Sequence, residues 1–208
     1  MAGKQAHAVR TIPQFKVKYK DVFHLKNMYT MMHEYLAEEG WRGPHSGAAS
    51  AYSHSDIEKL YLEKFSQKGL HQGGKEMWIY WRMYKQYEGK FSGYFKNHLD
   101  IDFHMVYITN MEVIHQGKKM KIQKGEIEMS FRAWIEGDYE GKWKNHWLLK
   151  HLQDVFEKRV WSQQLDKREK ELWREAYRLQ TRVKRYLNLR VFIPTPEPFW
   201  HPVYGYEG

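Results

Sequence analysis

Four polar residues at alternate positions, His98, Asp100, Asp102 and His104, are the side chains of this sequence best suited to metal binding or proton transfer. They belong to the stretch His-Leu-Asp-Ile-Asp-Phe-His-Met-Val over residues 98–106, in which the residues between them are apolar. Successive side chains of a β-strand point to opposite faces, so this pattern predicts a strand with the four polar groups on one face. Imidazoles and carboxylates there could bind a divalent metal ion, or act as acid and base inside a cavity.

A metal site on this strand would use only part of the set. Residues two apart on a strand lie about 6.6 Å from each other, whereas His98 and His104 lie roughly 20 Å apart and cannot share an ion. At most two pairs are possible, His98 with Asp100 and Asp102 with His104, and each pair needs further ligands. The candidates on neighbouring predicted strands are His115, Glu126 and Glu128. A divalent metal is the one cofactor that the sequence suggests; otherwise we expect none.

Ion pairs between neighbouring strands explain the same face without a metal. Asp100, Asp102, Glu126 and Glu128 can meet basic residues if the strands that carry them are adjacent. The candidate partners are Lys16, Lys18, Lys20, Arg82, Lys119, Lys121 and Arg132. Opposite charges directly across a ladder stabilise a sheet by about 0.2 to 1 kcal/mol per pair. Such a face would suit solvent, or a polar contact between identical subunits.

Basic residues near both ends of the chain indicate a second class of function, nucleic-acid binding. The net charge is +9, and clustered cations neutralise phosphates. Aromatic side chains on the predicted polar face could stack on bases, although the acids there would repel a phosphate backbone. The candidate phosphate-binding residues are Lys16, Lys18, Lys20, Arg178, Arg182, Lys184, Arg185 and Arg190. The C-terminal cluster could equally complement the dipole at the end of a helix.

The sequence contains no motif that identifies a reaction. It has no P-loop, no Gly-x-Ser-x-Gly, no His-Glu-x-x-His and no dinucleotide-binding fingerprint. We therefore assign no catalytic residue. A metal-dependent enzyme, or a ligand-binding protein that uses the 98–104 strand, is kept as a further alternative.

Alternation of apolar and polar residues predicts an antiparallel sheet with one buried face. A first strand covers residues 15–20, and a period of two continues over most of residues 75–135, with a hairpin turn around 116–118. Short connections between such runs are typical of an antiparallel meander.

Helical spacing predicts two N-terminal helices and a long C-terminal helical region. The first helix covers residues 25–39, and the second starts with the capping-box pattern Ser55-Asp-Ile-Glu58 and stops near Gly69. The long region covers residues 142–189 and would measure about 72 Å if uninterrupted. Its spacing loses phase between Trp161 and Leu165, where we expect a kink or two separate helices. The residues of its first apolar stripe are Trp143, Trp147, Leu148, Leu152, Val155 and Phe156.

The predicted fold class is therefore α+β, with a meander sheet that packs on one face against its helices. This order of elements resembles the helix-grip arrangement, in which a curved sheet wraps a C-terminal helix around a ligand cavity; the resemblance implies no functional residue. We expect a basic N-terminal arm at 1–14, an α+β domain at 15–160, a basic heptad-like helix extension at 161–190, and an extended tail rich in Pro and aromatic residues at 191–208.

Composition favours a single domain that stays out of the membrane. The chain has 208 residues, 42% of them hydrophobic, and no cysteine, which excludes disulfides and thiolate metal sites. No apolar stretch approaches the roughly 20 residues of a membrane span, and the N-terminus lacks the apolar run of a secretory signal. We therefore expect a cytoplasmic protein.

Assembly with further copies is the function that these features favour. Aromatic residues reach 16% of the chain, and Tyr and Trp are enriched in contacts between proteins. We expect a non-enzymatic, self-assembling structural subunit, such as that of a ring, tube, filament or virion-like particle, with nucleic acid or a large acidic assembly as a further possible partner. The expected subunit contacts are Leu165, Leu172, Leu179, Tyr186, Phe192, Phe199, Trp200, Tyr204 and Tyr206.

Overall fold

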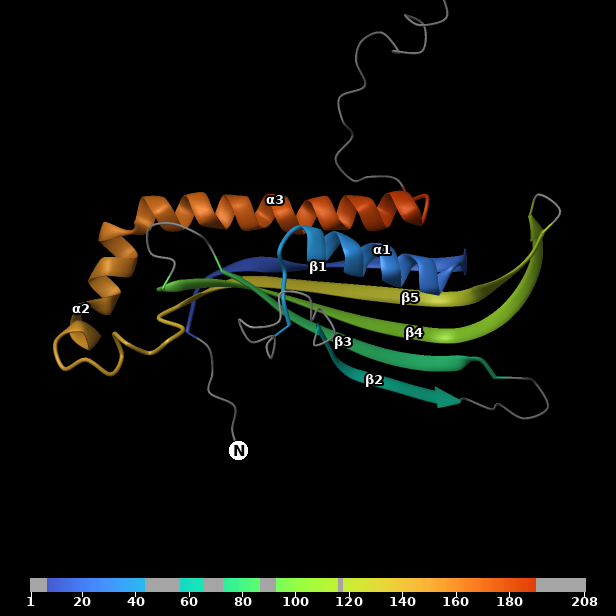
Figure 1. The fold of residues 1–208 in the computed structure, drawn as a ribbon, viewed down its shortest axis with the longest axis horizontal. Helices are drawn as coiled ribbons and strands as arrows, with labels where there is room; N and C mark the ends of the chain where they lie inside the picture. Colours follow the sequence, from blue (N-terminus) through green and yellow to red (C-terminus); the bar gives the residue numbers. More distant parts are fainter. Residues whose placement is uncertain (1–6, 44–56, 66–72, 87–92, 116–117, 190–208) are drawn as a thin grey trace, which may run out of the picture.

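The residues with a period of two form one antiparallel sheet. The computed structural model describes residues 7–43, 57–65, 73–86, 93–115 and 118–189. The strands are β1 (Ala8–Phe23), β2 (Glu58–Phe65), β3 (Lys75–Gln86), β4 (Phe95–His115) and β5 (Lys118–Gly137). The five strands lie in the order β1-β5-β4-β3-β2, so the first strand pairs with the last one (Figure 1). The predicted α+β class with a C-terminal long helix is thus confirmed.

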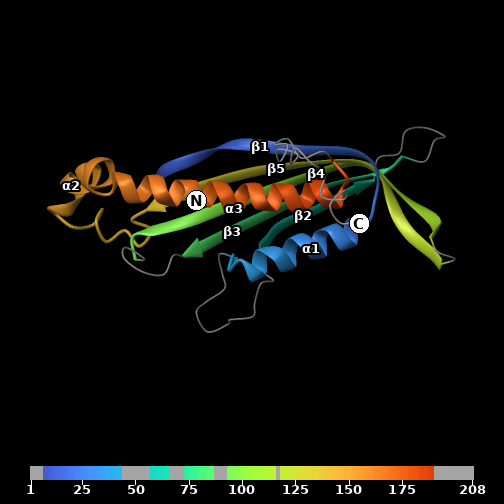
Figure 2. The same ribbon diagram turned by 90° about the horizontal axis from the view of Figure 1, so that it is seen from above.

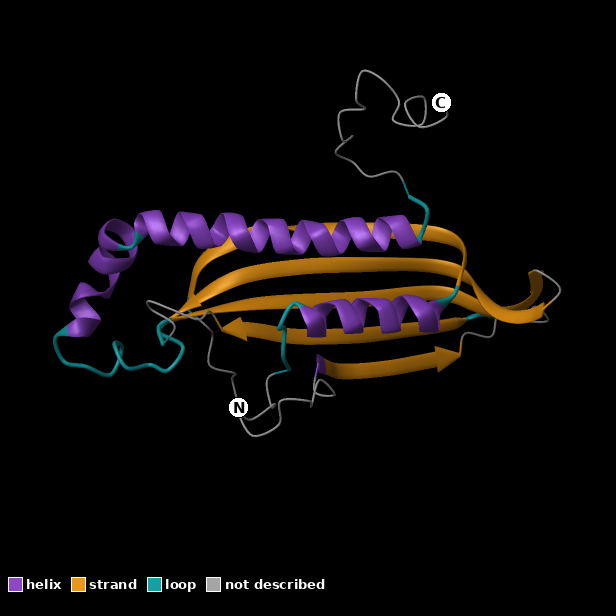
Figure 3. Cartoon of the chain, turned by 45° about the horizontal axis from the view of Figure 1, so that its top comes forward, coloured by secondary structure: helices purple, strands orange, loops and turns teal. Residues whose placement is uncertain are grey.

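Alternation along the strands creates a buried inner face. Ile101 and Phe103 of β4 are 0% exposed, and the apolar residues of β3 and β5 at matching positions are buried with them. Trp81 of β3 lies in the same layer, where its indole N–H donates to the hydroxyl of Tyr29, 2.8 Å away. Helices α1 and α3 cover this face, and none of the described helices lies on the opposite face (Figure 3).

Two helices form the layer on the inner face. They are α1 (Leu25–Glu38), which confirms the first predicted helix, and α3 (Ser162–Tyr186). The two run beside each other above the sheet (Figure 2). Leu165, Leu172 and Leu179 of α3 are at most 1% exposed and belong to the same core as the strands. Strands β1 and β4, of 16 and 21 residues, are long enough to lie along a helix of about 38 Å, so α3 shares one core with the sheet.

The C-terminal helical region breaks where its spacing loses phase. It consists of α2 (Leu149–Val155), the π-helical segment η2 (Phe156–Val160) and α3, with the break at Trp161. The expected interruption is confirmed, and of the two alternatives the structure shows two separate helices. The helix does not start at 142, because the Asp138 carboxylate accepts hydrogen bonds from the backbone N–H groups of Trp143 and Lys144 and holds them in turns.

The first apolar stripe of that region is only partly buried, which corrects the expectation. Trp143 and Phe156 pack against Trp161, with ring centroids 5.1 and 5.5 Å from it. In contrast, Trp147 is 75% exposed, and Leu148, Leu152 and Val155 are also exposed. Helix α2 turns away from the end of the sheet, so no strand covers these residues (Figure 1).

The second predicted helix is wrong, since residues 58–65 form the edge strand β2. It pairs with β3 in an antiparallel register that includes Tyr61 opposite Ile79. Every residue of β2 is exposed, so its apolar side chains do not pack on the core as one face of a helix would. Pairing with an available strand edge overrides the helical spacing of this short segment. Of the predicted capping box, Ser55 and Asp56 lie outside the described residues.

The first strand starts much earlier than predicted. It begins at Ala8, so residues 8–14 belong to the sheet rather than to a basic arm. Its register with β5 shifts between Ile12 and Phe15, which places Pro13 and Gln14 in a β-bulge. A bulge is one of the few positions in a sheet that tolerates proline.

The hairpin formed by β4 and β5 extends beyond its neighbours. Strand β3 pairs with β4 only as far as Ile108, and β1 pairs with β5 only as far as Gln123. Residues 111–115 and 118–122 pair only with each other among the described strands; we call this projection the β arm. In Figures 1 and 2 the end of the hairpin curves away from the rest of the sheet.

Among the described residues, none of the helices is both long and apolar enough to cross a membrane.

Candidate functional site

The predicted polar face of β4 is built around two aspartates and two arginines. Arg82 on β3, Asp100 on β4 and Arg132 on β5 stand directly opposite one another in the register. The Arg82 guanidinium lies 3.3 Å from Asp100 and 2.6 Å from Asp102, while that of Arg132 lies 3.7 and 3.0 Å from the same carboxylates. The pairing of charges across strands, one of two explanations of this face, is thus what the geometry displays.

Asp100 is the buried member of this quartet. The residue is 8% exposed, although it lies on the face without helices. Burial raises the pKa of its carboxyl group, and the neighbouring arginines Arg82 and Arg132 only partly offset that effect. An unpaired carboxylate at this depth would be costly, so the two guanidiniums are needed to keep it charged.

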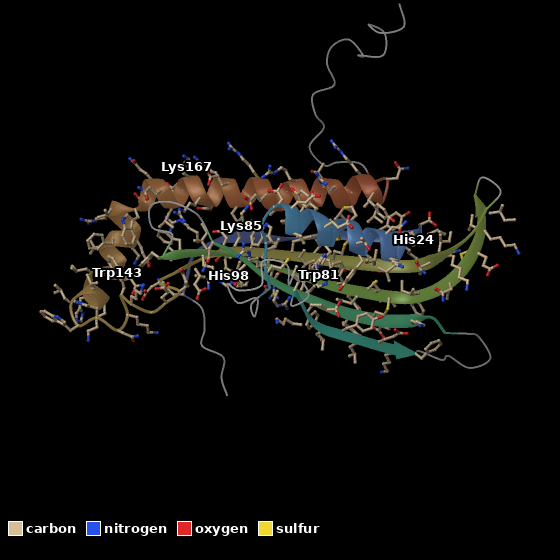
Figure 4. The ribbon with its side chains drawn as sticks, in the orientation of Figure 1. His24, Trp81, Lys85, His98, Trp143 and Lys167 are labelled. Carbon is tan, nitrogen blue, oxygen red and sulfur yellow. The ribbon has the colours of Figure 1, made fainter. Side chains whose placement is uncertain are left out.

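A histidine–tryptophan pair lies on each side of the quartet. The ring of His98 stacks on Trp134 with centroids 5.0 Å apart, and that of His104 stacks on Trp78 at 5.3 Å. Both pairs are direct cross-strand neighbours. Figure 4 labels His98 among the side chains of the sheet.

Each imidazole also contacts a glutamate of an adjacent strand. His98 Nε2 lies 2.6 Å from the Glu136 carboxylate, and His104 Nε2 lies 3.0 Å from that of Glu76. The hydrogen bond from His98 is the main cause that lowers the pKa of Glu136.

The four predicted metal ligands therefore use their polar atoms in other contacts. Both histidines face glutamates and both aspartates face arginines, so neither of the two proposed pairs comes together around an ion. No group of three or more His, Asp or Glu residues able to hold a metal ion occurs within the described ranges. Of the expected further ligands, Glu126 and Glu128 contact lysines of β1 instead, and the structure does not describe the side chain of His115.

A cleft of about 620 Å³ opens beside the bulge of β1, next to the quartet. Its lining residues are Ala8, Thr11, Ile12, Pro13, Gln14, Asp100, Arg132 and Trp134. The Gln14 amide donates to the hydroxyl of Ser130 and holds the bulge against β5. Sequence reasoning missed this cleft, because it placed Pro13 in an arm ahead of the first strand. A proline within a strand marks an edge or a bulge, and bulges are common next to active sites.

A second polar group that sequence reasoning missed is the buried Glu157 of η2. Its carboxylate accepts a hydrogen bond from the Tyr94 hydroxyl at 2.5 Å and from the Gln153 amide at 3.1 Å. His7 Nε2 lies 3.0 Å from its other oxygen. Burial, then the hydrogen bond to Glu157, raises the pKa of Tyr94. These contacts fasten the π-helical turn to the end of the sheet, and a single glutamate in a helical pattern gave no signal of this role.

The predicted phosphate-binding residues separate into two groups. Lys16 and Lys18 of β1 lie 2.7 and 2.6 Å from Glu128 and Glu126 of β5, and Lys20 stands opposite Glu126 in the register. These pairs lower the pKa of both glutamates and neutralise the lysines within the sheet. The residues of the second group, Arg178, Arg182 and Arg185, are exposed on α3, where Lys184 is half-buried. Arg190 lies outside the described residues.

The predicted subunit contacts also separate into groups. Leu165, Leu172 and Leu179 pack on the chain's own sheet, so they are not available to another subunit in this structure. Tyr186 is partly exposed, and its hydroxyl donates to the backbone oxygen of His24 at 2.9 Å. The tail residues Phe192, Phe199, Trp200, Tyr204 and Tyr206 lie outside the described residues.

Three other surfaces expose apolar side chains. The β arm exposes Met111, Val113 and Ile114, the last of them by 71%. The second surface is the edge strand β2, with Leu60, Tyr61, Leu62 and Phe65. The third, which we call the α2 stripe, consists of Trp147, Leu148, Leu152, Val155 and Val160. Exposed large apolar side chains of this kind are candidates for contacts with other proteins.

Comparison of the chain with protein-family models, with curated proteins and with solved structures returns no match. The function must therefore be inferred from the chain's own residues.

Proposed function

We propose that this protein is a non-enzymatic subunit of a homo-oligomeric assembly, in which the β arm packs on a neighbouring copy. The observation that carries the proposal is the arm itself. It continues beyond the last residues with which β1 and β3 pair, and it exposes Met111, Val113 and Ile114.

An isolated two-stranded ribbon is at best marginally stable in water. Met111 stands opposite Ile122 in the register, so the two occupy one face of the ribbon, while the exposed Ile114 lies on the other. A neighbouring copy that covers either face would remove apolar surface from water, at about 25 cal/mol per Å². That contribution would stabilise a ribbon that is otherwise only marginally stable.

The edge strand and the α2 stripe supply further contact surfaces. Strand β2 leaves one of its backbone edges without a partner among the described strands, and such an edge can pair with a strand of another chain. The α2 stripe lies at the end of the molecule opposite the β arm (Figure 1). Two different surfaces at opposite ends favour head-to-tail contacts, which build rings when they close and filaments when they do not.

A ligand cavity of the helix-grip kind is less well supported. The order of elements still resembles that arrangement, whose cavity lies between the sheet and the C-terminal helix. Here Leu165, Leu172 and Leu179 of α3 pack directly on the strands, and the described cleft opens on the opposite face of the sheet. The metal-enzyme alternative loses support as well, because the histidines and aspartates of β4 contact glutamates and arginines.

Measurement of the oligomer mass tests the proposal. Light scattering of the purified full chain should give a mass well above that of one copy, and the triple variant Met111→Ser/Val113→Ser/Ile114→Ser should lower it. The matched control, Lys119→Ser/Lys121→Ser, alters polar residues of the same arm and should leave the mass unchanged. A monomeric wild-type chain, or equal masses for wild type and triple variant, would contradict the proposal.

A second variant tests the part of the interface prediction that lies outside the described residues. A chain that ends at Arg190 should also give a lower mass if the aromatic tail residues contact a neighbouring copy. An unchanged mass would remove the tail from the proposed interface and leave the β arm to be judged by its own variant.

A further inference from the structure

Helix α3 presents a basic surface on the side that the sheet does not cover. Six cations are exposed along it: Lys167, Lys170, Arg174, Arg178, Arg182 and Arg185. At about 100° per residue, all six fall within a sector of about 120°, opposite the buried leucines. We call this sector the basic ridge. Figure 4 labels Lys167 on α3, and nitrogen-tipped side chains project from the helix on the side away from the sheet.

The acids of α3 mostly point elsewhere and are engaged by other elements. Arg10 of β1 lies 3.7 Å from Asp166 and 3.4 Å from Glu169. Lys85 of β3 lies 2.9 Å from Glu175, beneath the helix. These contacts use acids of the helix to attach it to the sheet and leave its outer surface positive.

Two acids do lie near the basic ridge. Glu171 falls within the same sector by its spacing, and the Glu39 carboxylate of α1 lies 3.8 Å from the Arg178 guanidinium. Arg182 is held in place by the ring of Tyr35, with its guanidinium 4.1 Å from the ring centroid. Six cations therefore face two acids, and the surplus is positive.

This arrangement costs helix stability. Lys170, Arg174, Arg178 and Arg182 follow one another at intervals of four residues, and like charges at that spacing repel each other and destabilise a helix. A bound polyanion would relieve the repulsion. From Lys167 to Arg185 the ridge measures about 27 Å, which corresponds to roughly eight steps of a double helix.

We propose that the basic ridge of α3 is a docking surface for the phosphate backbone of double-stranded DNA, without sequence preference. The B-form major groove, about 12 Å wide, admits an α-helix, whereas the major groove of duplex RNA is too narrow for one. The aromatic residues of α3, Trp173, Tyr177 and Tyr186, fall outside the sector, so the ridge lacks the stacking groups with which proteins bind single strands.

A lipid surface fits the ridge less well. Helices that lie on membranes insert an apolar face between lipid headgroups. The apolar face of α3, with Leu165, Leu172 and Leu179, is already buried on the sheet. The ridge supplies cations without apolar groups, and this combination matches a phosphate backbone.

Fluorescence anisotropy of a labelled 18-base-pair DNA duplex, titrated with the full chain, tests the proposal. Binding should weaken steeply with salt, with a slope of log K against log [salt] of about −4 to −5. The triple variant Arg174→Gln/Arg178→Gln/Arg182→Gln should reduce that slope by about 2.7 and weaken binding at 100 mM salt at least about tenfold. A second variant, Lys167→Gln/Lys170→Gln/Arg174→Gln, changes the other end of the ridge and avoids the contact of Arg182 with Tyr35.

The matched control removes the same charge at exposed positions away from α3. It is Lys119→Gln/Lys121→Gln/Lys124→Gln on β5, and it should change duplex binding less than threefold. Equal weakening by the control and by the ridge variants would overturn the proposal, because net charge alone would then explain binding. It would also be overturned if duplex RNA, single-stranded DNA or vesicles with anionic lipid bound as tightly, or if the duplex did not bind at 100 mM salt.

Discussion

The two faces of the sheet arise from the same alternation of residues, but different interactions stabilise them. On the inner face, side chains such as Phe103 and Trp81 are covered by helices and removed from water. On the outer face, which none of the described helices covers, Asp100 and its neighbours form cross-strand ion pairs instead. Burial of one large apolar side chain contributes about 1.5 to 3 kcal/mol, against about 0.2 to 1 kcal/mol for one cross-strand pair. The inner face therefore supplies most of the stability, and the outer face favours the correct register of the strands.

The largest expected effect comes from an aromatic residue of the inner face. Phe103→Ala should lower the free energy of unfolding by about 3 to 5 kcal/mol, because the ring is 0% exposed and contacts Trp81 edge to face, 5.1 Å between centroids. Trp134→Ala removes a larger ring from the outer face and should cost only about 1 to 2 kcal/mol. Urea unfolding followed by circular dichroism measures both values, and equal losses would contradict the contrast between the faces.

Removal of Asp100 should have an intermediate effect. Asp100→Ala leaves Arg82 and Arg132 with Asp102 as their remaining partner in the quartet, so we expect a loss of about 2 kcal/mol in unfolding free energy. Asp102→Ala should cost less, about 1 kcal/mol, because Asp102 is more exposed than Asp100. The same urea experiment compares the two, and a smaller loss for Asp100→Ala than for Asp102→Ala would show that burial does not set the strength of the quartet.

The smallest expected effect is a pair of pH dependences with opposite signs. The pKa of Glu136 is lowered, so its contribution is complete above the ordinary value of 4.5 and is lost as pH falls through the lowered pKa. The pKa of Asp100 is raised, so its charged form costs stability as pH rises from 3.8 through the raised pKa.

These signs can be separated by measuring unfolding free energies between pH 3 and pH 7. The stability advantage of wild type over Glu136→Gln should shrink as pH falls, whereas its advantage over Asp100→Asn should grow. Parallel curves for the two variants would show that the two carboxylates do not differ in the proposed way.

The sheet could be predicted because its buried and exposed faces produce an alternation of apolar and polar residues in the sequence. Ile101 and Phe103 alternate with Asp100 and Asp102, and the period of two follows directly from the pleat. Residues 58–65 lack this alternation, because a fully exposed edge strand buries neither of its faces. Their apolar residues fit the spacing of a helix equally well. Pairing with β3, which the local sequence does not encode, makes this segment a strand.

The candidate site was predictable in its residues but not in its partners. The sequence places His98 and Asp100 on one face, but which groups they meet depends on the register of β3 and β5. A single shift by one residue would exchange all these contacts. The packing of Leu165 and Leu172 on the chain's own sheet was missed for a similar reason. The spacing of an apolar stripe is the same whether it packs on its own sheet or on another subunit.

The order of the strands has a consequence for how the chain folds. Gln14 of β1 and Ser130 of β5, which contact each other, are 116 residues apart in the sequence. During synthesis, the first strand therefore leaves the ribosome long before β5, its partner among the described strands, exists. Contacts of such separation slow folding, and a strand that waits for its partner leaves unpaired backbone groups exposed to aggregation. We expect the meander of β2 to β5 to form first, with β1 added at its edge and α3 closing the core last.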